Sequence, residues 1–80
     1  MKFTQYFAQT RERIDRQHIK MEWIETAFYD PVREVIQDDG RIKRWAFIAE
    51  VDKYLRIIVL EDAITIHNAF FDRNFKTNES

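Results

Sequence analysis

The sequence predicts an α+β domain in which two N-terminal helices pack on a four-stranded antiparallel sheet. Apolar residues recur at the helical spacing as far as Tyr29, whereas β-branched and aromatic residues dominate the segments after Val32. One glycine and one proline among 80 residues favour regular elements joined by tight turns. We therefore expect a single domain over residues 1–76 and a flexible tail over residues 77–80.

Two helices are predicted before the Asp30-Pro31 dipeptide. Thr4 is suited to cap the first helix, because its hydroxyl can accept a hydrogen bond from the first turn. This helix is expected to run to about Gln17. The second is expected from about Lys20 to Tyr29, where Asp30-Pro31 ends it, because proline disfavours a helical conformation in the residue before it.

Three turn signals divide the remaining chain into four strands. Asp38-Asp39-Gly40 predicts a hairpin turn, because an Asp-Gly dipeptide tolerates positive φ. The polar breaks at 50–53 and Glu61-Asp62 predict the other two turns. The expected strands, which would follow one another as a meander, cover 32–37, 41–51, 54–60 and 64–71.

Both faces of this sheet are predicted to be apolar. One face is expected to carry Ile48, Ile58, Leu60, Ile64, Ile66 and Phe70, and the other Trp45, Phe47, Leu55, Ile57, Val59 and Phe71. Two short helices cover only one face, whereas an antiparallel sheet normally leaves its second face polar. We therefore expect the uncovered face, or a sheet edge, to dock a protein partner. The alternative is a sheet that curves over its own core.

The composition excludes several kinds of chemistry. The chain has no cysteine, and its only serine is Ser80, so disulfides, thiol catalysis and a Ser-His-Asp arrangement are excluded. A lone Gly40 cannot build a phosphate loop. No metal and no cofactor are expected. No apolar stretch approaches the length of a membrane span, so a cytoplasmic protein is expected. The net charge of −1 weakens the expectation of non-specific nucleic-acid binding.

The segment from His67 to Lys76 contains the candidate catalytic residues. In an extended strand, His67 and Arg73 would lie on the same side, because side chains alternate with a period of two. A histidine that moves a proton beside an arginine that stabilises phosphate charge could carry out phosphodiester transfer without a metal. The alternative is structural: a hydrogen-bonded His67, and a surface ion pair between Asp72 and Arg73.

Two arginines are predicted within strands. Arg44 and Arg56 have apolar neighbours, so each guanidinium needs a carboxylate partner or a ligand. They are expected to face each other or Glu50, or to bind substrate phosphate together with Tyr54. In a non-enzymatic protein, Tyr54 and Trp45 would instead be contact anchors for a partner.

Several short motifs occur in a characteristic order. They are Arg13-Ile14-Asp15-Arg16, Glu22-Trp23-Ile24, Asp39-Gly40-Arg41, Lys53-Tyr54-Leu55-Arg56 and His67-Asn68-Ala69-Phe70-Phe71-Asp72-Arg73. Their order resembles a family of small bacterial proteins of unknown function, which is distantly similar to the RelE/ParE/BrnT toxin superfamily. This resemblance implies a RelE/ParE-like fold and the toxin-like role in a bacterial toxin-antitoxin module. It also implies a small antitoxin-like protein partner, with RNA as the substrate of a metal-independent ribonuclease. The alternative is a non-enzymatic module that forms a homodimer or a hetero-oligomer.

Overall fold

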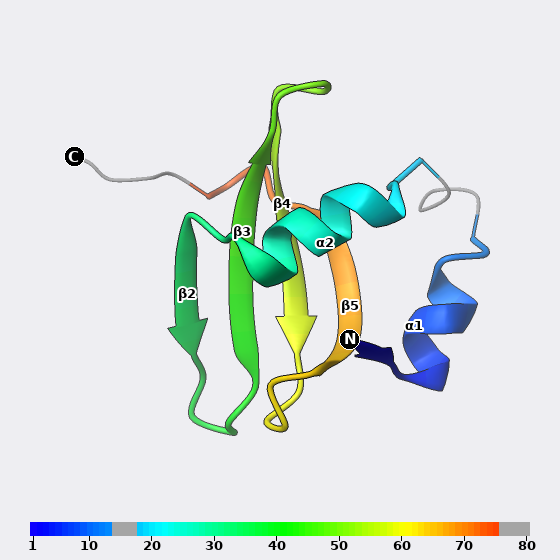
Figure 1. Ribbon diagram of the computed structural model, residues 1–80, viewed down its shortest axis with the longest axis vertical. Helices are drawn as coiled ribbons and strands as arrows, with labels where there is room; N and C mark the ends of the chain where they lie inside the picture. Colours follow the sequence, from blue (N-terminus) through cyan, green and yellow to red (C-terminus); the bar gives the residue numbers. More distant parts are fainter. Residues whose placement is uncertain (14–17, 76–80) are drawn as a thin grey trace.

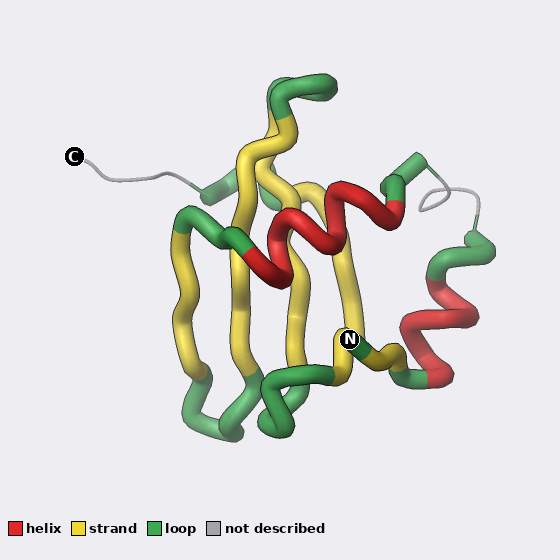
Figure 2. The backbone as a smooth tube through the Cα atoms, in the orientation of Figure 1, coloured by secondary structure: helices red, strands yellow, loops and turns green. Residues whose placement is uncertain are grey.

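Two helices and five strands make up the computed structural model, which describes residues 1–13 and 18–75. The elements are β1 (Lys2–Phe3), α1 (Gln5–Thr10), α2 (Met21–Tyr29), β2 (Arg33–Ile36), β3 (Ile42–Ile48), β4 (Lys53–Val59) and β5 (Thr65–Phe71). The strands form one sheet in the order β1-β5-β4-β3-β2. Helix α2 crosses one face of the sheet, and α1 lies beside β5 (Figures 1 and 2).

The predicted α+β class with two helices is confirmed, but the four-stranded antiparallel sheet is wrong. A fifth strand, β1, pairs in parallel with β5 and makes the sheet mixed. The amide of Lys2 donates to the carbonyl of Ile64 at 2.7 Å, and the amide of Thr4 donates to that of Ile66 at 3.1 Å. Sequence periodicity cannot identify a strand of two residues, because one alternation is not a pattern. The RelE/ParE-like arrangement stays a prediction.

Helix α1 begins where the sequence predicts and ends earlier. Thr4 is its N-cap, and the Thr4 hydroxyl accepts a hydrogen bond from the Phe7 amide at 3.0 Å. The helix ends at Thr10, whose hydroxyl donates to the Tyr6 carbonyl at 2.8 Å. The rest of the predicted helix reaches into residues 14–17, which lie outside the described residues. The predicted tail over 77–80 lies outside them too.

Helix α2 follows the prediction closely, because it ends at Tyr29, directly before Asp30-Pro31. Its buried residues, Trp23, Ile24 and Ala27, face β3 and β4. The largest fully buried side chains of the molecule lie in α1, α2 and the sheet: Phe7, Ile24, Leu55, Ile57, Ile66 and Val59. The core is therefore a single layer between the helices and one face of the sheet. No helix within 1–13 and 18–75 is long and apolar enough to cross a membrane.

The predicted division of side chains between the two faces is wrong. Strand β3 pairs with β4 so that Ala46 lies opposite Leu55 and Trp45 opposite Arg56. Side chains directly opposite each other share a face, so Trp45 lies on the face away from Leu55. Alternation along a single strand does not show which of its faces lies beside which face of the next strand. That relation depends on the register, which the turn between the two strands sets.

The pairing of β4 with β5 contains a register shift. The pairing shifts between Ile58 and Val59, so that Val59 lies opposite Ile66 while Ile58 lies opposite Asn68. An irregularity of this kind moves later residues to the other face. Ile66 therefore joins the buried face, whereas Phe70 lies on the opposite one.

The predicted hairpin turn at Asp38-Asp39-Gly40 is confirmed. Gly40 has a φ of +90°, in the region that favours glycine. A Cβ atom at this position would meet the Cβ of Glu61 at 3.2 Å, so the neighbouring turn also limits the space. The hairpin places β2 antiparallel to β3, where it forms one edge of the sheet.

Candidate functional site

The face of the sheet opposite the helices, here called the uncovered face, is the candidate site. The strand register assigns to it Arg33, Val35, Lys43, Trp45, Phe47, Tyr54, Arg56, Ile58, Asn68 and Phe70. Aromatic, aliphatic and basic side chains are therefore interspersed on this face. Phe47 is 42 % exposed. The prediction of two apolar faces is wrong for this one, because three of these side chains are cationic.

The chain after β5 folds back across the uncovered face. It leaves the end of β5 and passes on the side of the sheet away from α2 (Figure 1). The ring of Phe75 stacks on that of Trp45, with 4.7 Å between ring centroids and 16° between ring planes. It also meets Tyr54 edge-on at 4.9 Å. Trp45 is only 7 % exposed as a result.

Asp72 anchors this segment. Its Oδ2 accepts a hydrogen bond from Trp45 Nε1 at 3.0 Å and lies 3.5 Å from the Arg56 guanidinium. Its Oδ1 accepts a hydrogen bond from the Asn74 amide at 3.0 Å. Burial of the Asp72 carboxyl opposes its ionisation, but these hydrogen bonds and the Arg56 charge outweigh burial, so the Asp72 pKa lies below its ordinary value.

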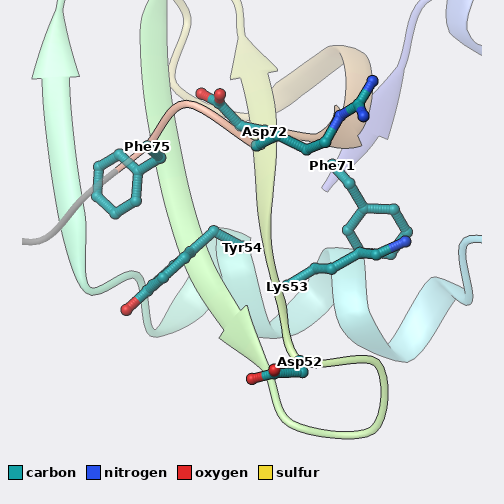
Figure 3. Close-up of a pocket in the computed structure, with 7 residues that line it drawn as sticks. Asp52, Lys53, Tyr54, Phe71, Asp72 and Phe75 are labelled. Atoms are coloured by element: carbon teal, nitrogen blue, oxygen red, sulfur yellow. The ribbon is translucent and has the colours of Figure 1, made fainter.

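A pocket lies at the end of the sheet where β4 begins and β5 ends (Figure 3). It has a volume of about 330 Å³ and is lined by Asp52, Lys53, Tyr54, Phe71, Asp72, Arg73 and Phe75. Phe75 and Tyr54 lie on one side of it, and Lys53 and Phe71 on the other. The Lys53 ammonium lies 5.4 Å from the centre of the Phe71 ring. The pocket thus combines two cations, two carboxylates and a phenol.

His67 lies away from this pocket. Its Nδ1 is 3.1 Å from the hydroxyl of Thr4, which caps α1, and its ring stacks on Tyr6 with centroids 4.8 Å apart. Arg73 lies beyond the last residue of β5 and lines the pocket. His67 contacts Thr4 and Tyr6 at the start of α1, whereas Arg73 lines the pocket at the end of β5, so the two predicted catalytic side chains belong to different parts of the molecule. His67 thus supports the start of α1, and only Arg73 of the two lines the pocket.

The two mid-strand arginines lie on opposite faces, because Arg44 is paired with Ile57 and Arg56 with Trp45. The prediction that they face each other or Glu50 is wrong. Arg44 Nε lies 2.6 Å from a Glu34 carboxylate oxygen, and its Nη1 donates to the Phe28 carbonyl at 3.0 Å. Glu50 instead accepts a hydrogen bond from the indole of Trp23.

Arg56 and Tyr54, both predicted to bind substrate, do lie on the uncovered face. The Arg56 guanidinium lies 4.4 Å from the centre of the Phe70 ring, in cation-π contact. Its Nε is buried without a hydrogen-bond partner among residues 1–13 and 18–75. Unsatisfied buried donors of this kind are uncommon in folded proteins.

The sequence reasoning did not identify Phe75, Lys43 and Arg33 as site residues. Lys43 and Arg33 carry no local signal, because only the strand register places them beside Trp45. A signal for Phe75 did exist. It is an isolated aromatic residue in a polar segment after the last strand, and such a residue often packs back on the domain.

Comparison with known proteins adds no relative: no family model matches the chain, and neither a curated protein nor a solved structure does.

Proposed function

We propose that this chain is a protein-interaction module that binds a partner through the uncovered face of its sheet. The observation that carries the proposal is the position of the helices, since the core formed by α1 and α2 lies on the other face. Phe47, Tyr54 and Ile58 remain partly accessible on the uncovered face. Partly exposed aromatic and aliphatic side chains that cluster in this way are typical of protein interfaces.

In the fuller form of this proposal, the chain is the toxin-like component of a bacterial toxin-antitoxin module, and its partner is a small antitoxin-like protein. The ordered sequence motifs described above support this role. A homodimer through the same face is the other assembly that the proposal allows.

Association of the purified chain, alone and with the product of an adjacent gene, tests the proposal. We expect light scattering coupled to gel filtration to show a dimer or a stable hetero-complex. Phe47→Asp should dissociate it, because a carboxylate would be buried among apolar groups. Tyr29→Asp is the matched control, because Tyr29 is 69 % exposed and belongs to the helix layer. A strict monomer that retains no partner would contradict the proposal.

A second candidate function, metal-independent RNA cleavage, is favoured by the pocket in Figure 3. Lys53 and Arg73 are cations that could hold phosphate oxygens there, and the hydroxyl of Tyr54 could take part in proton transfer. His67 lies outside this pocket, so in this proposal it supports α1.

Purified protein and a structured RNA test this candidate. Arg73→Ala and Tyr54→Phe should each lower the cleavage rate by about a hundredfold, the usual contribution of a positioned acid-base or electrostatic group. His67→Ala, checked for an unchanged fold by circular dichroism, should cleave normally. Loss of cleavage in His67→Ala alone would instead restore His67 as the catalytic group, and absence of any cleavage would remove the candidate.

A further inference from the structure

A hollow on the uncovered face is richer in positive charge than the chain as a whole. It has a volume of about 450 Å³ and lies over β2, β3 and β4. Its lining includes the cations Arg33, Lys43 and Arg56, together with Trp45 and Phe75. Asp72 is the only carboxylate that the described residues contribute to this lining. The hollow therefore carries a local excess of positive charge in a chain whose net charge is −1.

The strand register explains why three cations meet there. Arg33 lies directly opposite Trp45 on one side, and Arg56 lies directly opposite it on the other. Lys43 precedes Trp45 by two residues on the same strand and so shares its face. Cross-strand neighbours are about 5 Å apart, so the three cations surround a single indole ring.

Among residues 1–13 and 18–75, the positive charge of this hollow is only partly neutralised. Both oxygens of Asp72 are engaged, by Trp45 and Arg56 on one side and by the Asn74 amide on the other. The side chains of Arg33 and Lys43 make no hydrogen bond or ion pair with any residue that the structure describes. The buried Nε of Arg56 has no partner either within the same part of the chain.

The chemistry of the hollow fits carboxylates better than a nucleic acid. Asp72 shows that a carboxylate can accept hydrogen bonds from the Trp45 indole and lie beside Arg56. A single-stranded nucleic acid would need open aromatic faces for its bases, but Phe75 covers the ring of Trp45.

We propose that this hollow binds the carboxylates of an acidic polypeptide segment in the partner chain. The inference rests on the proposed interaction function and names the chemistry of the partner. Arg33 and Lys43 pair with the partner's carboxylates at the accessible rim, and the positive charge of Arg56, which also lines the hollow, adds to the attraction. Charge complementarity of this kind sets which partner is accepted and how it is oriented.

Decaglutamate is a suitable probe, because it supplies carboxylates without any other recognition feature. We expect it to shift the nitrogen-proton NMR signals of the Trp45 indole and of Arg56 Nε in a saturable way at low salt. The indole of Trp23 is an internal control, because it donates to Glu50 from the helix layer. Decaglutamine, which matches the probe in size but is neutral, should leave the signals of the Trp45 indole and of Arg56 Nε unchanged.

Two variants with the same change in net charge locate the effect. Lys43→Glu should weaken decaglutamate binding by about tenfold or more, because it replaces an attraction by a repulsion within the hollow. Lys20→Glu, at the start of α2, should weaken it by less than about twofold, since screening limits distant charges. Circular dichroism would show that both variants retain the fold.

Three outcomes would overturn the inference. They are no saturable shift with decaglutamate, equal shifts with decaglutamine, and tighter binding of decauridylate, which would make the hollow a nucleic-acid surface. The proposed function can survive such a result. If Phe47→Asp dissociates the complex while Lys43→Glu leaves it intact, the uncovered face still binds a partner, but its charged hollow does not select it.

Discussion

The two faces of the sheet differ in how completely their polar groups are satisfied, and two arginines on adjacent strands show the difference. On the helix-covered face, Arg44 binds both Glu34 and the Phe28 carbonyl. On the uncovered face, Arg56 has a distant carboxylate at 3.5 Å and a buried Nε without a partner among the described residues. Folding alone therefore accounts for the contacts of Arg44, whereas Arg56 keeps one donor unused among the described residues.

The same contrast applies to the apolar side chains of the two faces. Leu55, Ile57 and Val59 on β4 are fully buried beneath the helices. On the other side of the same sheet, Phe47 is 42 % exposed, and the ring of Trp45 is covered by Phe75, from the segment that follows β5. The covered face thus holds the deeply buried core, and the uncovered face holds side chains that remain partly accessible.

The largest expected effect tests this division through a pair of substitutions. Leu55→Ala should lower the free energy of unfolding by about 2–5 kcal/mol, because it opens a cavity in a fully packed core. Phe47→Ala should cost less than about 1 kcal/mol, since the Phe47 side chain is already partly in water. Urea unfolding monitored by circular dichroism measures both. Equal losses would show that the uncovered face is part of the core.

A smaller effect is expected for the matched arginine variants. Arg44→Met should cost about 1–3 kcal/mol, because the half-buried Phe28 carbonyl loses a charged donor. Arg56→Met should cost less than about 1 kcal/mol, since its ion pair is long and its Nε donates to no described group. The same unfolding measurement applies. A larger loss of unfolding free energy for Arg56→Met than for Arg44→Met would indicate that Arg56 stabilises the fold. The contrast between the two faces would then not hold.

Backbone strain in the β4–β5 turn gives a smaller expected change, independent of either face. Ala63 has a φ of +65°, which glycine adopts at lower cost. Ala63→Gly should therefore raise the free energy of unfolding by up to about 1 kcal/mol, despite the greater freedom of glycine in the unfolded chain. Ala8→Gly, on the exposed side of α1, should lower it by a similar amount. Two changes of the same sign would contradict this explanation.

The smallest expected effect is local and depends on pH. The Asp72 pKa is lowered in the folded protein, so the stability that its carboxylate contributes is present above the unfolded pKa of about 3.9. It is lost as pH falls through the lower folded value. The NMR signal of the Trp45 indole should shift over that acidic range, because its acceptor becomes protonated.

Asp72→Asn tests the assignment of that titration. The variant should remove the shift of the Trp45 indole signal while leaving that of Trp23, which donates to Glu50, unaltered. If the Trp45 signal still titrates over the same range in Asp72→Asn, another carboxyl group is responsible.

The sequence alone was sufficient for features that depend on neighbouring residues. The Thr4 cap, the end of α2 before Asp30-Pro31 and the hairpin at Gly40 all follow from local backbone preferences. The number and order of the long strands followed from periodicity in the same way. These interactions span a few residues, so the chain displays them directly.

The tertiary structure decided which side chains meet. Pairing of β1 with β5 joins residues more than sixty positions apart, and the turn between β3 and β4 sets whether Trp45 faces Leu55 or Arg56. A shift of one residue exchanges the two faces of a strand and leaves its own alternation unchanged. For that reason the sequence predicted a functional surface on this sheet, but only the folded chain places Arg33 and Lys43 around Trp45 and separates His67 from Arg73.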